Sequence, residues 1–586
     1  MKILLIVPTF QYKTRYPAFL SISDFPVGFA YLASALINAG HEVIGLNPNN
    51  ETGFGSQQEM VQVKIRESLK THRPDLVCLG GLCTDYAFLR DAMKIVRECS
   101  PGTPVVMGGG IINNDAEAAF EILKPDFCVR GEGEEILVQL AQNLANGVKD
   151  HSQIPNLGFW EKETARFSKL DFHYGPIDNR AFPDYEPFGI QAMMDHYWLA
   201  ARNLYRYSQL NPRLWPIVAA RSCPFSCTFC VHHRGVKYRA RSIGNIMQEI
   251  EYFYPRYQFN VLLLMDELFA INNERLCQFS EALLRMRDEK GWRFNWTFQT
   301  HASAAFSDDT LALAKKAGCY FFSYGMESAS PAVLASMNKR TKPAQILNAI
   351  QAANRLEIGF GGNFIFGDPA ETPRTLSETM NFFHDHCTDL HVDMFSIRPY
   401  PGSKLFDFCV AKGLIKDKVQ FYEHIDETAV NMTANSRWWW TLWIMALDYL
   451  GGLHLWIKSA RSVSCEPMMS SAENQIARHY GMQLFKVGVV CPHCGRKVHL
   501  QEMSSHGKTA EVFRIGRSKS GVIYWLWQLR TKAWFFYTCY SVAAVTSLLL
   551  KPFKLLLYLK NKEKFNTAPI LTGCPHCNKR FRLQIA

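Results

Sequence analysis

The sequence predicts an α/β protein in which two units of alternating strands and helices precede a basic, cysteine-rich region. Short apolar runs separated by helical stretches recur through residues 1–150 and again through 206–430. Two Cys-x2-Cys motifs fall in the last region, 431–586. The 586 residues, 48% of them hydrophobic, suffice for about three to four domains with sizeable cores.

The first unit carries five strand candidates, at 2–7, 41–47, 74–81, 104–110 and 126–135. A helix is predicted from 25, because Pro26 stands near the start of an apolar stretch. Strands that alternate with helices predict a parallel, doubly wound, Rossmann-like sheet. Glycines follow several of these strands, at the edge where such sheets bind ligands.

Residues 151–205 show no clear periodicity and are predicted to be a linker that packs across both units. The second unit then carries six strand candidates, at 216–220, 259–269, 294–301, 319–328, 358–367 and 391–400. Polar residues gather where these strands end, which is the functional rim of barrel-like α/β folds.

Three cysteines follow the first strand of the second unit at a Cys-x3-Cys-x2-Cys spacing: Cys223, Cys227 and Cys230. Thiolates are the soft ligands that iron–sulfur clusters prefer, and this spacing fits one loop around three irons of a cubane. The alternatives are a zinc knuckle completed by His232 or His233, and chance.

The loop, with Phe229 just before its last cysteine, resembles the signature of the radical S-adenosylmethionine (SAM) superfamily. The resemblance implies a 4Fe–4S cluster held by the three cysteines, with the fourth iron left open to chelate SAM. It also implies that the ring of Phe229 packs near the adenine of SAM.

The resemblance continues along the second unit and implies a partial (β/α)6 barrel of the TIM type. Residues that resemble SAM contacts of the family are Arg241, Asp266, Glu327 and Ser328, with the backbone of Phe364, Ile365 and Phe366. The sequence departs from relatives at Gln299 and His301, where Arg is common, and at Asp368 and Ala370 in a Gly-Leu-Pro-Gly-Glu-Thr-like turn. The alternative for each residue is helix capping or a salt bridge within the barrel.

Three stretches of the first unit, 26–33, 108–110 and 130–134, resemble the cobalamin-binding domain that precedes many radical SAM barrels. The resemblance implies cobalamin contacts at Gly108, Gly109, Gly110, Gly131 and Glu132. No Asp-x-His-x-x-Gly motif is present, so no histidine is offered as a lower axial ligand. The alternative is a Rossmann-like domain without cobalamin, since glycine-rich turns also serve nucleotide sites and plain turns.

These resemblances imply an enzyme that reductively cleaves SAM to functionalise an unactivated C–H bond, with cobalamin-dependent methyl transfer to carbon as the expected reaction. The first alternative is a cobalamin-associated radical cyclase or oxidoreductase without methyl transfer. The second is a non-enzymatic zinc-ribbon protein that binds nucleic acid, which the intact cysteine triad disfavours. We expect a small-molecule or lipid substrate, a reductant such as flavodoxin or ferredoxin, and no nucleic acid.

The C-terminal region contains a matched pair of knuckles, Cys491-Pro-His-Cys494 and Cys574-Pro-His-Cys577. Two such pairs predict a zinc-ribbon-like site, the alternative being an auxiliary iron–sulfur cluster. Gly495 and Asn578 follow the second cysteine of each pair, where a tight turn calls for positive φ.

The same region is strongly basic, with 21 Lys or Arg against 6 Asp or Glu from 431 onward, and it holds eight of the 13 Trp. Its 18-residue uncharged run at 533–550 is predicted to be a hydrophobic helical insert that meets a membrane surface, a buried helical hairpin being the alternative. With no signal peptide expected and seven of 17 Cys in metal-type motifs, we expect a reducing cytoplasm.

Overall fold

The computed structural model describes residues 1–9, 12–13, 25–51, 56–196, 212–231, 236–425, 429–441, 443–444, 458–467, 483–504 and 570–584. The predicted insert at 533–550 lies outside the described residues, as do His232 and His233. Among the described helices, none has the length and apolar character needed to cross a membrane.

The first sheet confirms the predicted doubly wound fold. Its strands are β1 (Lys2–Ile6), β2 (Glu42–Leu46), β3 (Leu76–Gly80), β4 (Val105–Gly108), β5 (Phe127–Val129), β6 (Leu157–Glu161) and β7 (Thr164–Phe167). They lie in the order β2-β1-β3-β4-β5-β6-β7, with the first five parallel and the last two antiparallel. The strand order reverses between β1 and β3, which places the ligand-binding crevice at their carboxyl ends.

Two strands of this sheet were not predicted. The β6–β7 hairpin falls in the interval 151–205, whose mixed aromatic and polar composition has no clear period, and it extends the first domain to Phe167. Beyond it the described part of the interval holds short 3-10 turns, at Ile177–Asn179 and Glu186–Phe188, and α7 (Ile190–His196).

Helices cover both faces of the first sheet because its central strands are apolar on both sides. In β1, Ile3 and Leu5 pack on one face with α1 (Val27–Asn38) and α6 (Glu134–Ala145). Leu4 and Ile6 pack on the other face, which the remaining helices cover: α2 (Gln57–His72), α3 (Tyr86–Cys99), α4 (Gly110–Asn114) and α5 (Ala116–Leu123).

The second sheet confirms six parallel strands in an open, partial barrel. They are β8 (Leu214–Ile217), β11 (Val261–Leu264), β12 (Asn295–Thr300), β13 (Cys319–Glu327), β14 (Gly359–Phe366) and β15 (His391–Ser396). The order is β15-β14-β13-β12-β11-β8, and each neighbouring pair is parallel. No described ladder joins β15 to β8, so β15 is an edge strand.

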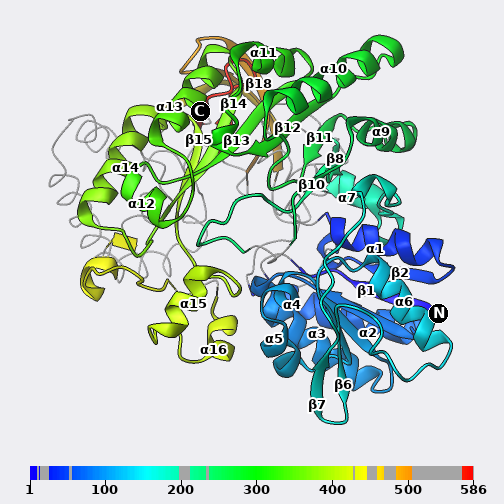
Figure 1. Cartoon of the computed structure of the whole chain (residues 1–586). Helices are drawn as coiled ribbons and strands as arrows, with labels where there is room; N and C mark the ends of the chain where they lie inside the picture. The colour runs from blue at the N-terminus through cyan, green and yellow to red at the C-terminus, as the bar shows by residue number, and fades with distance from the viewer. Residues whose placement is uncertain are drawn as a thin grey trace.

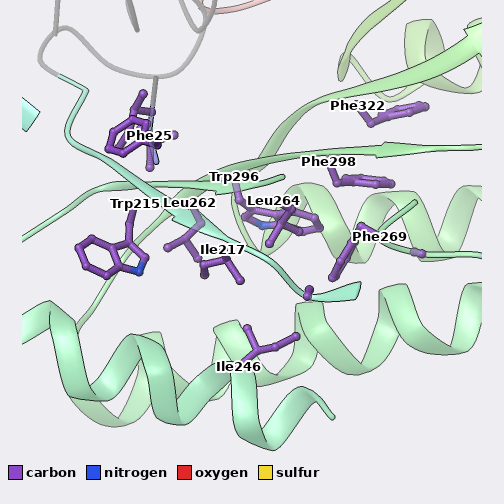
Figure 2. Packing of buried hydrophobic residues seen from close by; sticks show 14 of the residues in the cluster. Phe25, Trp215, Ile217, Ile246, Leu262, Leu264, Phe269, Trp296, Phe298 and Phe322 are labelled. Atoms are coloured by element: carbon purple, nitrogen blue, oxygen red, sulfur yellow. The ribbon is translucent and has the colours of Figure 1, made fainter. Parts of the chain in front are cut away.

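The helices of the second unit lie on one face of this sheet (Figure 1). They are α9 (Ile243–Tyr257), α10 (Asn273–Lys290), α11 (Asp308–Lys316), α12 (Pro331–Ser336), α13 (Pro343–Arg355) and α14 (Pro373–His386). Figure 2 shows the core between strands and helices, where Trp215, Trp296, Phe298 and Phe322 lie along the strands above Ile246 of α9. Trp215 stacks on Tyr257 with a ring separation of 5.2 Å.

The last helices of the second unit, α15 (Lys404–Ala411) and α16 (Lys418–Glu423), pack on the first domain. Tyr422 stacks on Tyr86 of α3, with ring centroids 5.4 Å apart. Lys418 pairs with Asp115 at 2.9 Å. The two domains are therefore joined at two places along the chain, by the segment that links them and by these helices.

The C-terminal strands form a separate five-stranded sheet in the order β18-β17-β16-β20-β19. They are β16 (Ser459–Pro467), β17 (Gln483–Val490), β18 (Lys497–Ser504), β19 (Ile570–Gly573) and β20 (Arg580–Gln584). The turn between β17 and β18 carries one cysteine knuckle, and the turn between β19 and β20 carries the other.

Candidate active site and cofactor cavities

The cysteine loop lies between β9 (Ala220–Arg221) and β10 (Arg239–Ala240), an antiparallel pair that follows β8. Two segments hold the loop from the side. The Thr228 amide donates to the Met337 carbonyl at 2.9 Å, and Asn338 donates to the Ser226 carbonyl at 3.0 Å. The Leu405 amide, at the start of α15, donates to the Thr228 carbonyl at 3.1 Å. The loop is thus anchored both to the barrel and to the helices that reach the first domain.

The three thiols suit a multi-iron cluster better than a single ion. Cys227 is buried, and Cys223 and Cys230 are half-buried. Burial raises the pKa of all three thiols, that of Cys230 to about 12, so cluster assembly must displace their protons. Their sulfurs do not gather within 4.8 Å of one another; among the described residues, only the C-terminal cysteines do so.

His301, one of the departures from the family, supports the loop. Its ring stacks on Phe225 with centroids 4.0 Å apart, and its Nε2 lies 2.9 Å from the Lys339 carbonyl. Burial, with a smaller contribution from the Lys339 ammonium, lowers the pKa of His301 to about 4. The ring is therefore neutral near pH 7, and it packs between the cysteine loop and the barrel.

Glu327 ends β13 in the left-handed region, with φ of 61°, at an irregularity in the pairing with β14. Its carboxylate accepts a hydrogen bond from Lys339 at 3.0 Å, and both side chains are nearly buried. The same ammonium lies 5.8 Å from the centre of the Phe229 ring. Burial lowers the pKa of Lys339, but Glu327 and Cys227 outweigh it and raise the pKa above its ordinary value.

Lys339 is not among the site residues that the sequence predicts. It stands in a polar turn after α12, where a lysine is normally solvated, and no period or motif marks it. The structure instead places a buried positive charge beside the cysteine loop, balanced by Glu327.

Two of the predicted SAM contacts, Arg241 and Asp266, make their polar contacts within the barrel itself. Arg241 forms a fully buried ion pair with Glu249 at 2.5 Å. Asp266 accepts hydrogen bonds from the Ala219 and Ala220 amides at 2.7 and 2.9 Å, which fixes the start of β9. The contacts of these two side chains correspond to the alternative of salt-bridging and capping.

Ser328 is likewise buried, with its hydroxyl 3.0 Å from that of Thr379 on α14. On β14, Phe364 and Phe366 point into the core toward the helices, whereas Ile365 is half-buried on the opposite face. Ile365 and Phe229 pack against the same hydrophobic cluster. The backbone contact with adenine predicted for this strand stays a prediction.

The turn after β14 carries two buried acids, Asp368 and Glu371. Glu371 accepts a hydrogen bond from the Thr375 hydroxyl at 2.9 Å. Burial raises the pKa of Glu371 to about 7.

A cavity of about 720 Å³ lies between the carboxyl edge of the first sheet and the barrel. All five residues predicted for cobalamin line it: Gly108, Gly109, Gly110, Gly131 and Glu132. The barrel contributes Val218, Arg221 and Met265. Its size is that of a substantial ligand pocket.

The glycines give this cavity its shape. Gly109 has φ of 82°, and a Cβ there would lie 2.8 Å from the Gly81 amide nitrogen. A Cβ on Gly110 would lie 2.9 Å from the Leu82 side chain. The turns therefore bring bare backbone to the ligand edge of the sheet, as a large ligand requires. No histidine is among the described lining residues.

Glu132 also joins the two domains. Its carboxylate pairs with Arg221 at 2.9 Å, with Arg239, and with Arg180 at 3.7 Å. Arg221 in turn pairs with Glu134 at 2.6 Å. Since Arg221 is two residues before Cys223, this network ties the wall of the cavity to the cysteine loop.

The four C-terminal cysteines form a compact metal-type site. Sulfur separations are 3.7 Å for Cys491–Cys577 and for Cys494–Cys574, and all four sulfurs lie within 4.8 Å of one another. Sulfurs about 2.3 Å from one tetrahedral ion lie about 3.8 Å apart. The positive φ predicted for the residues that follow each pair is confirmed, at 73° for Gly495 and 54° for Asn578.

Comparison with known families adds two matches. The model of the Radical SAM superfamily matches residues 217–383, and that of the B12 binding domain matches residues 25–141. The first match contains the cysteine loop and β11 to β14, and the second contains the glycine turns that line the cavity.

Two curated relatives illustrate the range of proteins that the chain resembles. A protein of Pyrococcus horikoshii described as an uncharacterised methyltransferase is 26% identical over 422 residues, which span 71% of this chain and 84% of that protein. The anaerobic magnesium-protoporphyrin IX monomethyl ester cyclase of Cereibacter sphaeroides is also 26% identical, over 68% of this chain and 61% of the cyclase.

Among solved structures, the chain resembles the radical SAM methyltransferase TsrM of Kitasatospora setae with cobalamin and a [4Fe-4S] cluster bound. The TM-score is 0.54 at 18% identity, over 70% of this chain and 75% of TsrM. The cobalamin-dependent radical enzyme OxsB matches with a TM-score of 0.54 at 14% identity, over 74% of this chain and 58% of OxsB. These likenesses concern the fold.

Proposed function

This chain is a radical SAM enzyme with an N-terminal B12-binding domain, and from that premise we propose that it transfers a methyl group to an unactivated carbon. The observation that carries the proposal is the shared cavity. Its walls come from the glycine turns of the first sheet and from Val218, Arg221 and Met265 of the barrel. A cobalamin in that cavity would face the same junction as the cysteine loop.

When bound, the cluster and SAM supply a 5′-deoxyadenosyl radical, and cobalamin supplies the methyl group. The chain's own residues hold and shield these groups. Cys223, Cys227 and Cys230 would ligate the cluster, while Glu327 and Lys339 fix the charge beside it. The ion pairs around Glu132 fix the spacing between the two cofactor sites.

The test is the fate of SAM in anaerobically reconstituted protein with a strong reductant, with and without hydroxocobalamin. We expect 5′-deoxyadenosine in both cases and S-adenosylhomocysteine only with cobalamin. Replacing the three loop cysteines together with alanine should abolish both products. A second variant, Gly109→Ala, tests the cobalamin site separately. It should bind cobalamin more weakly, because its Cβ would lie 2.8 Å from the Gly81 amide nitrogen, and it should keep the cluster, because the loop cysteines are intact.

A radical cyclase is the second candidate, favoured by the likeness to the protoporphyrin ester cyclase. Cyclisation consumes SAM without methyl transfer, so it yields 5′-deoxyadenosine and no S-adenosylhomocysteine. That outcome, with cobalamin bound, would contradict the methyltransferase proposal and support the cyclase.

We propose zinc for the C-terminal cysteines. Their 3.7 Å sulfur separations fit four thiolates on one tetrahedral ion, which is the usual structural zinc site. An auxiliary iron–sulfur cluster would need the sulfurs further apart, because each would ligate a different iron.

We also propose an external reductant such as flavodoxin or ferredoxin and, from the basic charge and Trp content beyond 431, recruitment to an anionic membrane surface. Flotation with anionic liposomes tests the second point. A variant lacking 521–560 should float less than the full chain, and equal flotation of both would contradict the proposal.

A further inference from the structure

We propose that the C-terminal sheet is a metal-organised plug that seats in the amino end of the barrel, at its open β14–β15 edge. The proposal rests on the metal site proposed above. The contacts between the C-terminal sheet and the barrel, which we call the seat, do not involve the thiols. Figure 1 shows the C-terminus beside β14 and β15, on the side of the barrel away from the first domain. The plug is therefore remote from the cysteine loop.

Arg580 is the centre of the seat. Its amide donates to the Asp389 carbonyl at 3.0 Å, just before β15 begins. Its guanidinium pairs with Asp393, inside β15, at 3.2 Å, and the side chain is only 7% exposed. The neighbouring Lys579 pairs with the Asp389 carboxylate at 2.6 Å.

A second contact lies at the start of β14. Asn578 donates to the Glu357 carbonyl at 2.8 Å across a sequence separation of 221 residues. A Cβ built on Gly359 would lie 3.4 Å from that of Asn578, which is van der Waals distance, so this turn packs directly on the start of β14. Gly359 and Gly361 lie on the face of β14 opposite to Phe360 and Phe364, which pack toward the helices, so the plug meets the inner face.

Both knuckles contribute to the seat. His493, between the cysteines of the first knuckle, lies 3.0 Å from the Arg580 carbonyl and 3.8 Å from the Asp389 carboxylate. Asn578, Lys579 and Arg580 follow the second knuckle. The seat therefore requires both turns in one fixed orientation. Strand β16 joins the two hairpins by pairing with β17 and β20, and a shared ion would fix their cysteine turns against each other.

The position of the plug explains why the barrel would need it. β15 is an edge strand with one described neighbour, β14, and edge strands open more readily than central ones. Contacts from four residues of the plug converge on the amino ends of these two strands: Arg580, Lys579, Asn578 and His493. We infer that the plug protects the amino end of this edge from opening.

The test compares full-length protein variants by elemental analysis and by hydrogen–deuterium exchange. Wild type should hold one zinc per chain in addition to its iron. Cys494→Ser with Cys577→Ser should lose the zinc and raise exchange at 389–393 by at least about tenfold. Arg580→Met should raise exchange there while keeping the zinc, because the thiols are intact. Arg374→Met, which removes an exposed pair with Glu378 on α14, is the matched control and should change neither.

The two proposals fail in different ways. Iron in place of zinc at the C-terminal cysteines would refute the metal assignment, whereas the exchange result in Arg580→Met would still decide the plug. Unchanged exchange at 389–393 in both Arg580→Met and the double cysteine variant would overturn the plug, whatever metal is bound.

Discussion

Replacing Arg241 with methionine should destabilise the barrel rather than weaken SAM binding alone. The guanidinium donates to Glu249 at 2.5 Å, to the Asn245 side chain at 2.7 Å and to the Val218 carbonyl at 3.1 Å. After the substitution, Glu249 would keep one described partner, the indole of Trp215 at 3.4 Å. A carboxylate would thus remain in the core without its counter-charge.

The magnitude follows from the burial of the pair. The Arg241 and Glu249 side chains are 2% and 0% exposed, so solvent cannot replace the lost partner. Breaking such a pair from one side costs about 3–5 kcal/mol. Burial already raises the pKa of Glu249 even with the arginine in place, so protonation will limit the loss in acid. Against a typical domain stability of about 5–15 kcal/mol, the loss is large.

The assay is urea unfolding followed by tryptophan fluorescence, together with SAM binding by equilibrium dialysis of reconstituted protein. Lys290→Met is the matched control, because its ion pair with Glu251 is more than one-third exposed on both sides and should be worth less than about 1 kcal/mol. The double variant Arg241→Met with Glu249→Met should recover most of the stability. An unchanged unfolding midpoint combined with a tenfold loss of SAM affinity would refute this reasoning and restore Arg241 as a SAM contact.

Two further predictions concern buried charges. Burial raises the pKa of Glu371 from 4.5 to about 7, so its stabilising protonation is complete below about pH 4.5 and is lost as the pH rises through 7. The free energy of unfolding of the wild type should therefore fall by at most about 3 kcal/mol between pH 5 and 8 through this group, and Glu371→Gln should remove that fall. An equally steep fall in the variant would count against the prediction. Lys339→Met should lower the reduction potential of the reconstituted cluster by tens of millivolts, because it removes a positive charge beside the loop. Lys339→Arg keeps that charge and should leave the potential at the wild-type value. Electron paramagnetic resonance titration measures that shift, and identical potentials in all three proteins would contradict the role of the charge.

The sequence alone determined the parallel strands of both large sheets. Buried parallel strands are short apolar runs, and this local pattern can be recognised without knowing which elements pack on the strands. The cysteine motifs could equally be recognised from the sequence, because ligands within one loop are close in sequence as well as in space. The positive φ at Gly495 and Asn578 belongs with them, since it follows from the knuckle turn itself.

Tertiary structure alone decided what the polar side chains do. Arg241 and Asp266 stand at motif positions, yet burial commits them to Glu249 and to the amides of Ala219 and Ala220. Lys339 looks like a surface lysine in sequence and becomes a buried charge only because the chain folds it against the cysteine loop.

The same holds for how the domains join. The β6–β7 hairpin, the seat of α15 and α16 on the first domain and the contact of Asn578 with the start of β14 all join segments distant in the chain. Local periodicity reports which face of an element is apolar, but it does not report which distant element covers that face. Long-range partners are selected by packing and by the need to satisfy buried charges and hydrogen-bonding groups, and these quantities exist only in the folded chain.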